Sequence, residues 1–180
     1  MTTVVLVQGL PGSGKTTLAD MLEKLILGSC RINADQIRST VSKDLKFSIT
    51  DRKMQAYRLG AISGVALAKP IQVIGGSASP IDHYNSCVIV DFVNPTEETR
   101  ALFRWSLKNT LASGHPSKLL EIWMNTISKD SSRFKDTSNL YVPPSLNDID
   151  YVVEGWKTDE ELSVEAQIIV KNLFKPQRYL

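Results

Sequence analysis

The sequence contains few of the residues from which metal centres and disulfide frameworks are built. It has two cysteines, Cys30 and Cys87, and two histidines, His83 and His115, in 180 residues. Each cysteine lies in an apolar run, which favours two buried thiols over a structural disulfide. The histidines are isolated in polar segments without the spacing of metal ligands, so we interpret them as surface residues.

Long apolar runs and an excess of charge are also missing. No stretch approaches the roughly 18 consecutive apolar residues of a membrane-spanning helix, and the apolar start lacks the basic segment of a signal peptide. The 21 basic and 19 acidic residues give a net charge of +2, which is too even for a general nucleic-acid or membrane surface. We therefore expect a single cytoplasmic domain over residues 1–180, with no membrane partner and no nucleic-acid partner.

Apolar strands alternate with amphipathic helices along the chain. The β-branched run Val4–Val7 predicts a strand buried on both faces, and the apolar stripe from Leu18 to Ile26 predicts a helix that Gly28 can close. Further strands are predicted at 30–32, 71–76, 87–93 and 151–153. Further helices are predicted at 48–68, after Pro95, at 119–127 and from Thr158. This order predicts an α/β fold with three layers, α/β/α, around a parallel sheet of about five strands.

The segment Gly9–Thr16 reads G-L-P-G-S-G-K-T and matches the phosphate-binding pattern G-x-x-x-x-G-K-[ST] of P-loop NTPases. It lies between the first strand and the first helix, where backbone N–H groups and the helix N-terminus can hold a phosphate. Lys15 is predicted to reach the β- and γ-phosphates as a catalytic residue, and Thr16 to ligate Mg²⁺. The predicted ATP-binding residues are Gly9, Leu10, Pro11, Gly12, Ser13, Gly14, Lys15, Thr16 and Thr17.

Two missing motifs narrow the class of nucleotide-binding protein. No N-K-x-D segment is present to read guanine, and the strand V-I-V-D-F lacks the acidic pair usual in motor ATPases. What remains is a phosphotransferase that moves the γ-phosphate of MgATP to a second substrate. We interpret Asp91 in that strand as a hydrogen-bonded or edge acid and not as a residue of the metal side.

Candidates for the acceptor side follow the second predicted strand. In N-A-D-Q-I-R, Asp35 can accept a hydroxyl proton or hold a metal-bound water, and Arg38 can clamp an anion. The alternative is that Asp35 caps a helix and Arg38 is a solvated cation. Phe47 offers an aromatic face near Arg52, and Arg52 lies in the first turn of a predicted helix. A cation there opposes the helix dipole, so Arg52 is either exposed or placed for an anion.

Four segments within residues 1–82, taken together, resemble the adenylylsulfate kinase family in order and spacing. G-L-P-G-S-G-K-T-T-L-A, N-A-D-Q-I-R, S-K-D-L-K-F-S-I-T-D-R and S-A-S-P resemble the family motifs GLSGSGKTT, DGDN[VI]R, L-x-x-DLGFS-x-x-DR and F-I-S-P. Enzymes of that family move the γ-phosphate of ATP to the 3′-hydroxyl of adenylylsulfate. The resemblance therefore implies a magnesium-dependent kinase of sulfate assimilation.

Carried over residue by residue, the resemblance implies a role for each matching position. Asp35 would serve the hydroxyl and, through water, the metal. Arg38 and Arg52 would hold the phosphosulfate, Phe47 would stack on the adenine, and Ser79–Pro80 would line the site. Ser79 matches a serine described in the family as a phosphoserine intermediate and is thus a catalytic candidate, although direct in-line transfer needs no covalent intermediate. The resemblance also implies a homodimer.

Departures from the family motifs fall on the acceptor side. The replacing residues are Asn33, Ala34, Gln36, Lys46 and Gln55. The family's lid, K-G-L-Y-K-K-A-R, has no clear counterpart. Arg100, Arg104 and Lys108 on the helix after Pro95 are candidates for a replacement lid, or else they form a solvated helix face.

Two other classes of function stay open. N-x-D-x-x-R after the second strand also resembles the polynucleotide 5′-hydroxyl kinases, so the acceptor could be another hydroxyl, including that of a small metabolite. The chain could instead be a nucleotide-binding module without transfer activity, because the acceptor side departs from the family.

Overall fold

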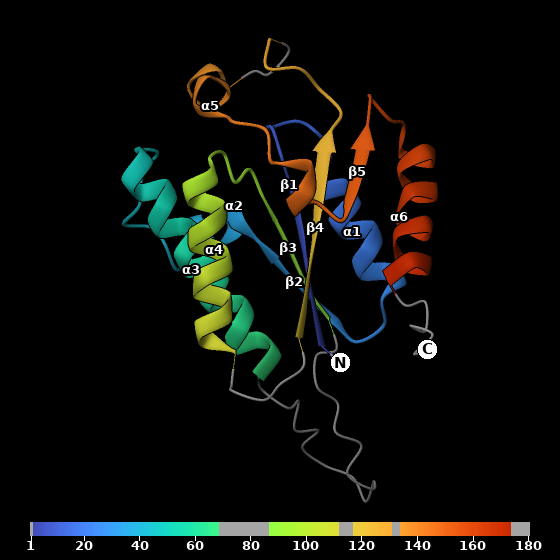
Figure 1. The fold of residues 1–180 in the computed structure, drawn as a ribbon, viewed down its shortest axis with the longest axis horizontal. Helices are drawn as coiled ribbons and strands as arrows, with labels where there is room; N and C mark the ends of the chain where they lie inside the picture. Colours follow the sequence, from blue (N-terminus) through green and yellow to red (C-terminus); the bar gives the residue numbers. More distant parts are fainter. Residues whose placement is uncertain (1, 69–86, 112–116, 131–133, 174–180) are drawn as a thin grey trace, which may run out of the picture.

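Within the described residues, five parallel strands form one sheet in the order β2-β3-β1-β4-β5 (Figure 1). The computed structural model describes residues 2–68, 87–111, 117–130 and 134–173. The strands are β1 (Thr2–Gly9), β2 (Ser29–Asn33), β3 (Cys87–Phe92), β4 (Ser117–Asn125) and β5 (Tyr151–Glu154). Because every pair is parallel, all carboxyl ends meet at one edge of the sheet, where open α/β folds bind their ligands.

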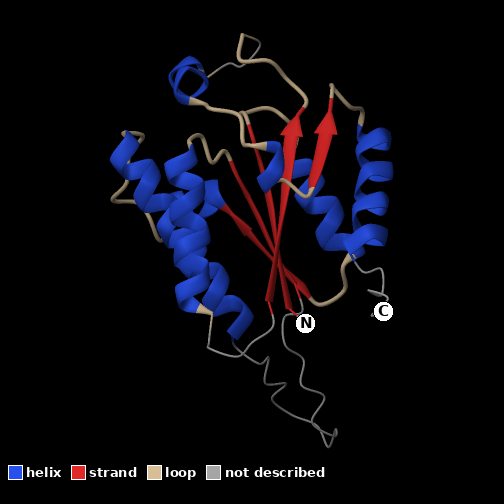
Figure 2. Ribbon diagram, viewed as in Figure 1, coloured by secondary structure: helices blue, strands red, loops and turns tan. Residues whose placement is uncertain are grey.

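Helices cover both faces of the sheet and complete the three predicted layers (Figure 2). On one face lie α1 (Lys15–Leu25) and α6 (Asp159–Leu173), and on the other α3 (Ile49–Ala68) and α4 (Glu97–Thr110). The short elements are α2 (Ala34–Ser39), α5 (Lys135–Leu140) and a 3-10 helix (Leu146–Asp148). In the part of the chain that the structure describes, no helix has the length and apolar character needed to cross a membrane.

The β-branched run in β1 explains why both faces need a helical layer. Val5 and Val7 belong to the apolar cluster that includes residues of α1 and α6. Val4 and Leu6 belong to the cluster that includes residues of α3 and α4. All four side chains are buried, so the prediction of a strand covered on both sides is confirmed.

Side-chain caps begin the long helices where the sequence predicts them. Asp51 N donates to Ser48 Oγ at 3.2 Å at the start of α3. Before α6, Glu161 N donates to Thr158 Oγ1 at 3.2 Å and Thr158 N donates to Glu161 Oε2 at 2.8 Å. Each cap satisfies backbone groups that the first turn leaves unpaired. The two predicted helix starts are therefore confirmed.

The helix predicted over residues 119–127 is wrong, because this segment forms β4. The strand lies between β1 and β5, and Leu120, Ile122 and Met124 are buried in the core. A short strand covered on both faces has the same apolar run as a buried helix segment, so periodicity cannot separate the two. The strand predicted at 71–76 lies outside the described residues.

Candidate active site

The loop between β1 and α1 has the backbone geometry of a phosphate cradle. Gly12 and Gly14 have φ values of 87° and 84°, which residues with a side chain rarely adopt. Thr126 Oγ1 donates to the Ser13 carbonyl oxygen at 2.8 Å and ties the loop to the end of β4. Since α1 begins at Lys15, its free N–H groups and partial positive charge act at the same loop.

Lys15 folds back over this loop. Its Nζ donates to the Leu10 carbonyl oxygen at 2.7 Å, and its side chain is buried. Burial lowers the pKa of Lys15 to about 8, and the negative charges of Asp91 and Asp35 oppose that shift. An anion bound in the loop would favour the charged lysine in the same way.

The buried carboxylate of Asp91, at the end of β3, accepts three hydrogen bonds. Thr16 Oγ1 donates at 3.1 Å, Arg31 Nε at 3.0 Å and Asn33 Nδ2 at 2.7 Å. The prediction that Asp91 is a hydrogen-bonded acid is confirmed by these contacts. Its hydrogen bond with the Thr16 hydroxyl of the P-loop was not predicted. P-loop NTPases hold Mg²⁺ with the loop Ser/Thr and a strand-terminal Asp. The available signal was one acid at the end of an otherwise apolar strand.

Asn33 caps α2, which leaves Asp35 available. Asn33 Oδ1 accepts from Gln36 N at 2.9 Å, so the alternative in which Asp35 provides the cap is wrong. Asp35 is exposed in the first turn of α2 and lines a cavity together with Lys15. Its carboxylate is thus open to a ligand on the P-loop side of that cavity.

A cavity of about 330 Å³ lies beside the P-loop at the carboxyl edge of the sheet. It brings together eight of the predicted site residues, namely Pro11, Gly12, Lys15, Thr16, Asp35, Arg38, Phe47 and Arg52. The remaining lining residues are Ala34, Gln55, Asp91, Phe92, Val93, Asn94, Pro95, Phe134 and Thr137. Ser79 and Pro80 lie outside the described residues.

Two guanidinium groups lie over one aromatic ring in this cavity. The Cζ atoms of Arg38 and Arg52 lie 4.9 and 5.6 Å from the centroid of Phe47. Burial lowers the pKa of Arg52, and the positive charge of Arg38 lowers it further. Among the ion pairs of the described residues, none includes Arg38 or Arg52. This wall therefore favours an anionic ligand.

Both arginines are held by neutral acceptors. Arg38 Nη1 donates to the Lys46 carbonyl oxygen at 2.6 Å. Arg52 Nε donates to the Phe47 carbonyl oxygen at 2.9 Å, and its Nη2 donates to Thr137 Oγ1 at 2.9 Å. The contact with Thr137 joins α3 to α5 across the cavity. The positive charges are thus fixed in place without being neutralised.

Two further segments of the cavity wall were missed by sequence reasoning. Phe92–Pro95 reads F-V-N-P and matches the first and last positions of F-I-S-P, the motif that the sequence analysis assigned to Ser79–Pro80. Phe134 comes from the α5 segment. Phe47 and Phe134 are 66% and 60% exposed, although phenylalanine is usually buried. Exposed rings at a cavity can stack on a flat ligand.

A second cavity, of about 190 Å³, borders the P-loop from the side of β5 and α6. Gly12 lines both cavities, so the loop separates them. The wall of the second cavity also includes Thr17, Thr126 and Trp156, whose indole is exposed. This cavity offers an aromatic surface next to the phosphate cradle.

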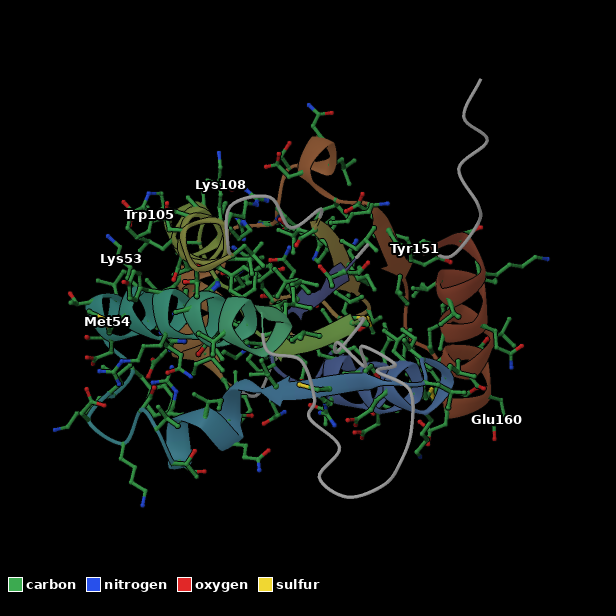
Figure 3. The ribbon with its side chains drawn as sticks, turned by 90° about the horizontal axis from the view of Figure 1, so that it is seen from below. Lys53, Met54, Trp105, Lys108, Tyr151 and Glu160 are labelled. Carbon is green, nitrogen blue, oxygen red and sulfur yellow. The ribbon has the colours of Figure 1, made fainter. Side chains whose placement is uncertain are left out.

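The structure corrects the interpretation of the α4 arginines as a lid. Arg100 is buried, and its Nη1 donates to two backbone carbonyl oxygens at 3.1 and 3.0 Å. Arg104 donates to Glu121 at 2.5 and 3.1 Å. Lys108 is exposed in the last turn of α4 (Figure 3), whereas the carboxyl end of β3 lies before the first turn. Guanidinium groups engaged inside the protein cannot also cover a bound nucleotide.

Comparison with known sequences gives one family. The family model described as adenylylsulphate kinase matches residues 1–152. An adenylyl-sulfate kinase of Buchnera aphidicola subsp. Schizaphis graminum is 35% identical over 81 residues, 43% of this chain and 38% of the relative. One of Deinococcus deserti is 33% identical over 98 residues, 52% of this chain and 54% of the relative. The matches thus span between 38% and 54% of these relatives' length.

Comparison with solved structures gives the fold. The structure of the Mycobacterium tuberculosis APS kinase in complex with AMPPNP and APS has a TM-score of 0.70 and 19% sequence identity. The similarity covers 97% of this chain and 98% of that chain. At this identity the likeness establishes a shared α/β fold.

Proposed function

The chain belongs to the adenylylsulphate kinase family, and from this premise we propose that it transfers the γ-phosphate of MgATP to the 3′-hydroxyl of adenylylsulfate. One observation carries the proposal. A single cavity joins the P-loop residues Lys15 and Thr16 to a wall of Arg38, Phe47 and Arg52. The first group suits a phosphate donor, and the second suits an acceptor that is both aromatic and anionic.

On the donor side, the phosphates of ATP would lie against the N–H groups of the P-loop. Lys15 would leave the Leu10 carbonyl oxygen, its partner at 2.7 Å, and pair with the β- and γ-phosphates. The base would extend toward the second cavity, where the exposed indole of Trp156 can stack on a purine. Ser13, Gly14 and Thr17 of the predicted ATP-binding set border the same cavity.

The donor set next to the P-loop fits Mg²⁺. The Thr16 hydroxyl and the Asp91 carboxylate are hard oxygen ligands in mutual contact at 3.1 Å, and Asp35 can hold a metal-bound water. Mg²⁺ is usually bound through one or two carboxylates plus substrate phosphates, which matches this small set. When bound, the ion neutralises charge on the β- and γ-phosphate oxygens.

On the acceptor side, Arg38 and Arg52 would hold the phosphosulfate, and the adenine would stack on Phe47. Asp35 would accept the proton of the 3′-hydroxyl as the γ-phosphate is transferred. Phe134 supplies a second exposed ring at the same cavity. We propose that Asn94 and Pro95 line this site in the role first given to Ser79–Pro80, with direct transfer to the hydroxyl.

The test is ADP release from ATP in the presence of different acceptors. We expect stimulation by adenylylsulfate above any stimulation by nucleosides, gluconate-type metabolites or 5′-hydroxyl oligonucleotides. Arg38→Ala should remove acceptor-dependent turnover while ATP binding remains. Stimulation by 5′-hydroxyl oligonucleotides alone would identify the polynucleotide-kinase alternative. ATP binding without release of ADP for any acceptor would identify a binding module.

The proposal has three further parts. One kinase domain over residues 1–180 should unfold in a single cooperative transition by calorimetry. A homodimer, implied by the family resemblance, should give twice the chain mass by light scattering at micromolar concentration. A cytoplasmic location should place the protein in the soluble fraction after cell disruption.

A further inference from the structure

A buried chain of polar side chains runs from α4 through the sheet to the acceptor cavity. Arg104 donates to both carboxylate oxygens of Glu121, at 2.5 and 3.1 Å. Gln8 Nε2 donates to Glu121 Oε2 at 2.8 Å, and Asn94 Nδ2 donates to Gln8 Oε1 at 3.0 Å. Gln8, Glu121 and Asn94 are each at most 3% exposed. Polar groups at such depth are costly unless they are paired.

The chemistry of these groups fixes the direction in which each amide points. A guanidinium only donates, and the carboxylate paired with it only accepts. Gln8 must therefore turn its NH₂ group toward Glu121 and its oxygen toward Asn94. Asn94 must then turn its NH₂ group toward Gln8. Its remaining function, Oδ1, is buried and meets no donor among the described residues.

Asn94 belongs to the cavity wall that faces the α5 segment. Its φ of 49° is a left-handed conformation, which asparagine adopts more readily than most residues. Pro95 O accepts from Val142 N at 2.8 Å, and Arg100 Nη1 bridges Asn94 O and Val142 O. These contacts tie the wall to the segment that follows α5, the element preceded by Phe134. Phe134 and Asn94 both line the acceptor cavity, so a base stacked on that ring shares the cavity with Asn94.

The side-chain amide of Gln55, in the same cavity, also donates through its nitrogen and leaves its oxygen unpaired. Gln55 Nε2 donates to the Ala34 carbonyl oxygen at 3.2 Å, and a carbonyl oxygen can only accept. Gln55 Oε1 is thus directed away from that partner, and within the described residues it too meets no donor. Both buried amides therefore present acceptors, so the groups that pair with them must donate.

We infer that Asn94 Oδ1 accepts a hydrogen bond from the exocyclic amino group of the acceptor's purine, and that the chain Arg104–Glu121–Gln8 holds it in that orientation. The inference rests on the proposed function, because it takes the acceptor to be an adenine nucleotide. An amino group at this position pairs with Oδ1. A carbonyl oxygen there would place two acceptors against each other, with neither satisfied. Asn94 is thus a specificity-determining residue, and Gln8 and Glu121 are positioning residues.

The test compares the binding of adenylylsulfate with that of its 6-oxo analogue, inosine 5′-phosphosulfate, by titration calorimetry without ATP. We expect the unmodified protein to bind the 6-amino ligand at least about tenfold more tightly, the effect of one hydrogen bond replaced by two opposed acceptors. Glu121→Gln gives the chain an amide that can donate to Gln8. The side-chain amides of Gln8 and Asn94 would then turn over, and Asn94 would present its NH₂ group to the ligand. The preference should then disappear or invert.

Asp148→Asn is the matched control. Asp148 Oδ2 lies 3.6 Å from Arg104 Nη1, so this variant also removes one carboxylate from Arg104 but leaves the buried chain intact. It should keep the full preference. Asn94→Gly provides a second variant that tolerates the left-handed backbone and removes the amide. It should bind both ligands within about twofold of each other, whether or not Glu121→Gln folds.

Each outcome decides between this inference and the proposed function. Equal binding of the two ligands by the unmodified protein would overturn the inference, as would a full preference in Glu121→Gln or Asn94→Gly. A preference lost equally in Asp148→Asn would overturn the role of the buried chain. If the protein binds the 6-amino ligand more tightly than the 6-oxo ligand but does not phosphorylate adenylylsulfate, the kinase activity is overturned and the inference stands. Failure to bind either ligand would overturn both.

Discussion

Thr16 Oγ1 donates a hydrogen bond of 3.1 Å to Asp91 Oδ2 and joins the P-loop to the end of β3. The two residues are 75 positions apart in the sequence. Their contact depends on the parallel pairing of β1 with β3, in which Val7 lies opposite Asp91. The proposed metal side of the site therefore depends on the pairing of strands in the sheet and not on the P-loop alone.

Asp91→Asn should weaken the apparent affinity for Mg²⁺ in ATP turnover by about 10- to 100-fold, because it removes the negative charge beside the Thr16 hydroxyl. The measurement is turnover against Mg²⁺ concentration at saturating ATP. Asp20→Asn is the control, because Asp20 pairs with the same Arg31 but lies outside the cavity. An unchanged Mg²⁺ dependence in Asp91→Asn would exclude Asp91 from the metal side.

Nucleotide binding at high pH should be coupled to protonation of Lys15. Its pKa is about 8 in the folded protein, against an ordinary value of 10.5. Between these values the free folded protein lacks a proton that the unfolded chain holds, so the free energy of unfolding rises with pH. A bound polyphosphate favours the charged lysine, and binding at about pH 9 should therefore take up a proton.

Titration calorimetry in two buffers of different ionisation enthalpy measures this proton uptake. The heat of binding should depend on the buffer in the unmodified protein, and the dependence should shrink in Lys15→Met. Equal heats in both buffers for the unmodified protein would mean that Lys15 is already charged before the nucleotide binds.

Phe134→Ala should raise the KM for adenylylsulfate with little change in the KM for ATP. Loss of one base-stacking ring costs about 1–3 kcal/mol, and the ring is exposed at the acceptor cavity. Trp105→Ala is the control, since Trp105 is an exposed aromatic residue on α4 (Figure 3). Its ring packs against Tyr57 at 5.9 Å between ring centroids. An equal rise in both KM values would argue against stacking at Phe134.

Arg100→Met should lower the free energy of unfolding by about 2–4 kcal/mol, because two backbone carbonyl oxygens lose a charged donor. Lys108→Ala should change it by less than about 0.5 kcal/mol, as expected of an exposed surface residue. Urea denaturation measures both. An Arg100→Met protein as stable as the unmodified one would contradict this structural role of Arg100.

Local signals in the sequence were enough to predict the donor half of the site. The P-loop is one continuous segment, and the capping residues Ser48 and Thr158 act within one turn of their helices. Phe47 and Arg52 could also be found locally, because both lie near the start of α3. Residues that function within a few positions of one another leave a readable pattern.

The other half of the site depends on which strands become neighbours. β4 was taken for a helix because its burial on both faces is a consequence of lying between β1 and β5. Asp91, Asn94 and Phe134 reach the cavity from separate elements, so their spacing in the sequence carries no signal. The α4 arginines were interpreted either as a lid or as a solvated helix face, because a charged helix face does not reveal that Arg100 is buried against backbone carbonyl groups.

The most direct test of the proposed function is the structure of the reaction product. Phosphorus NMR and mass spectrometry of the mixture formed from ATP and adenylylsulfate identify the hydroxyl that is phosphorylated. We expect ADP and one new phosphate on the ribose 3′-hydroxyl, with the phosphosulfate intact. Unchanged adenylylsulfate under conditions where the chain binds both nucleotides would contradict it.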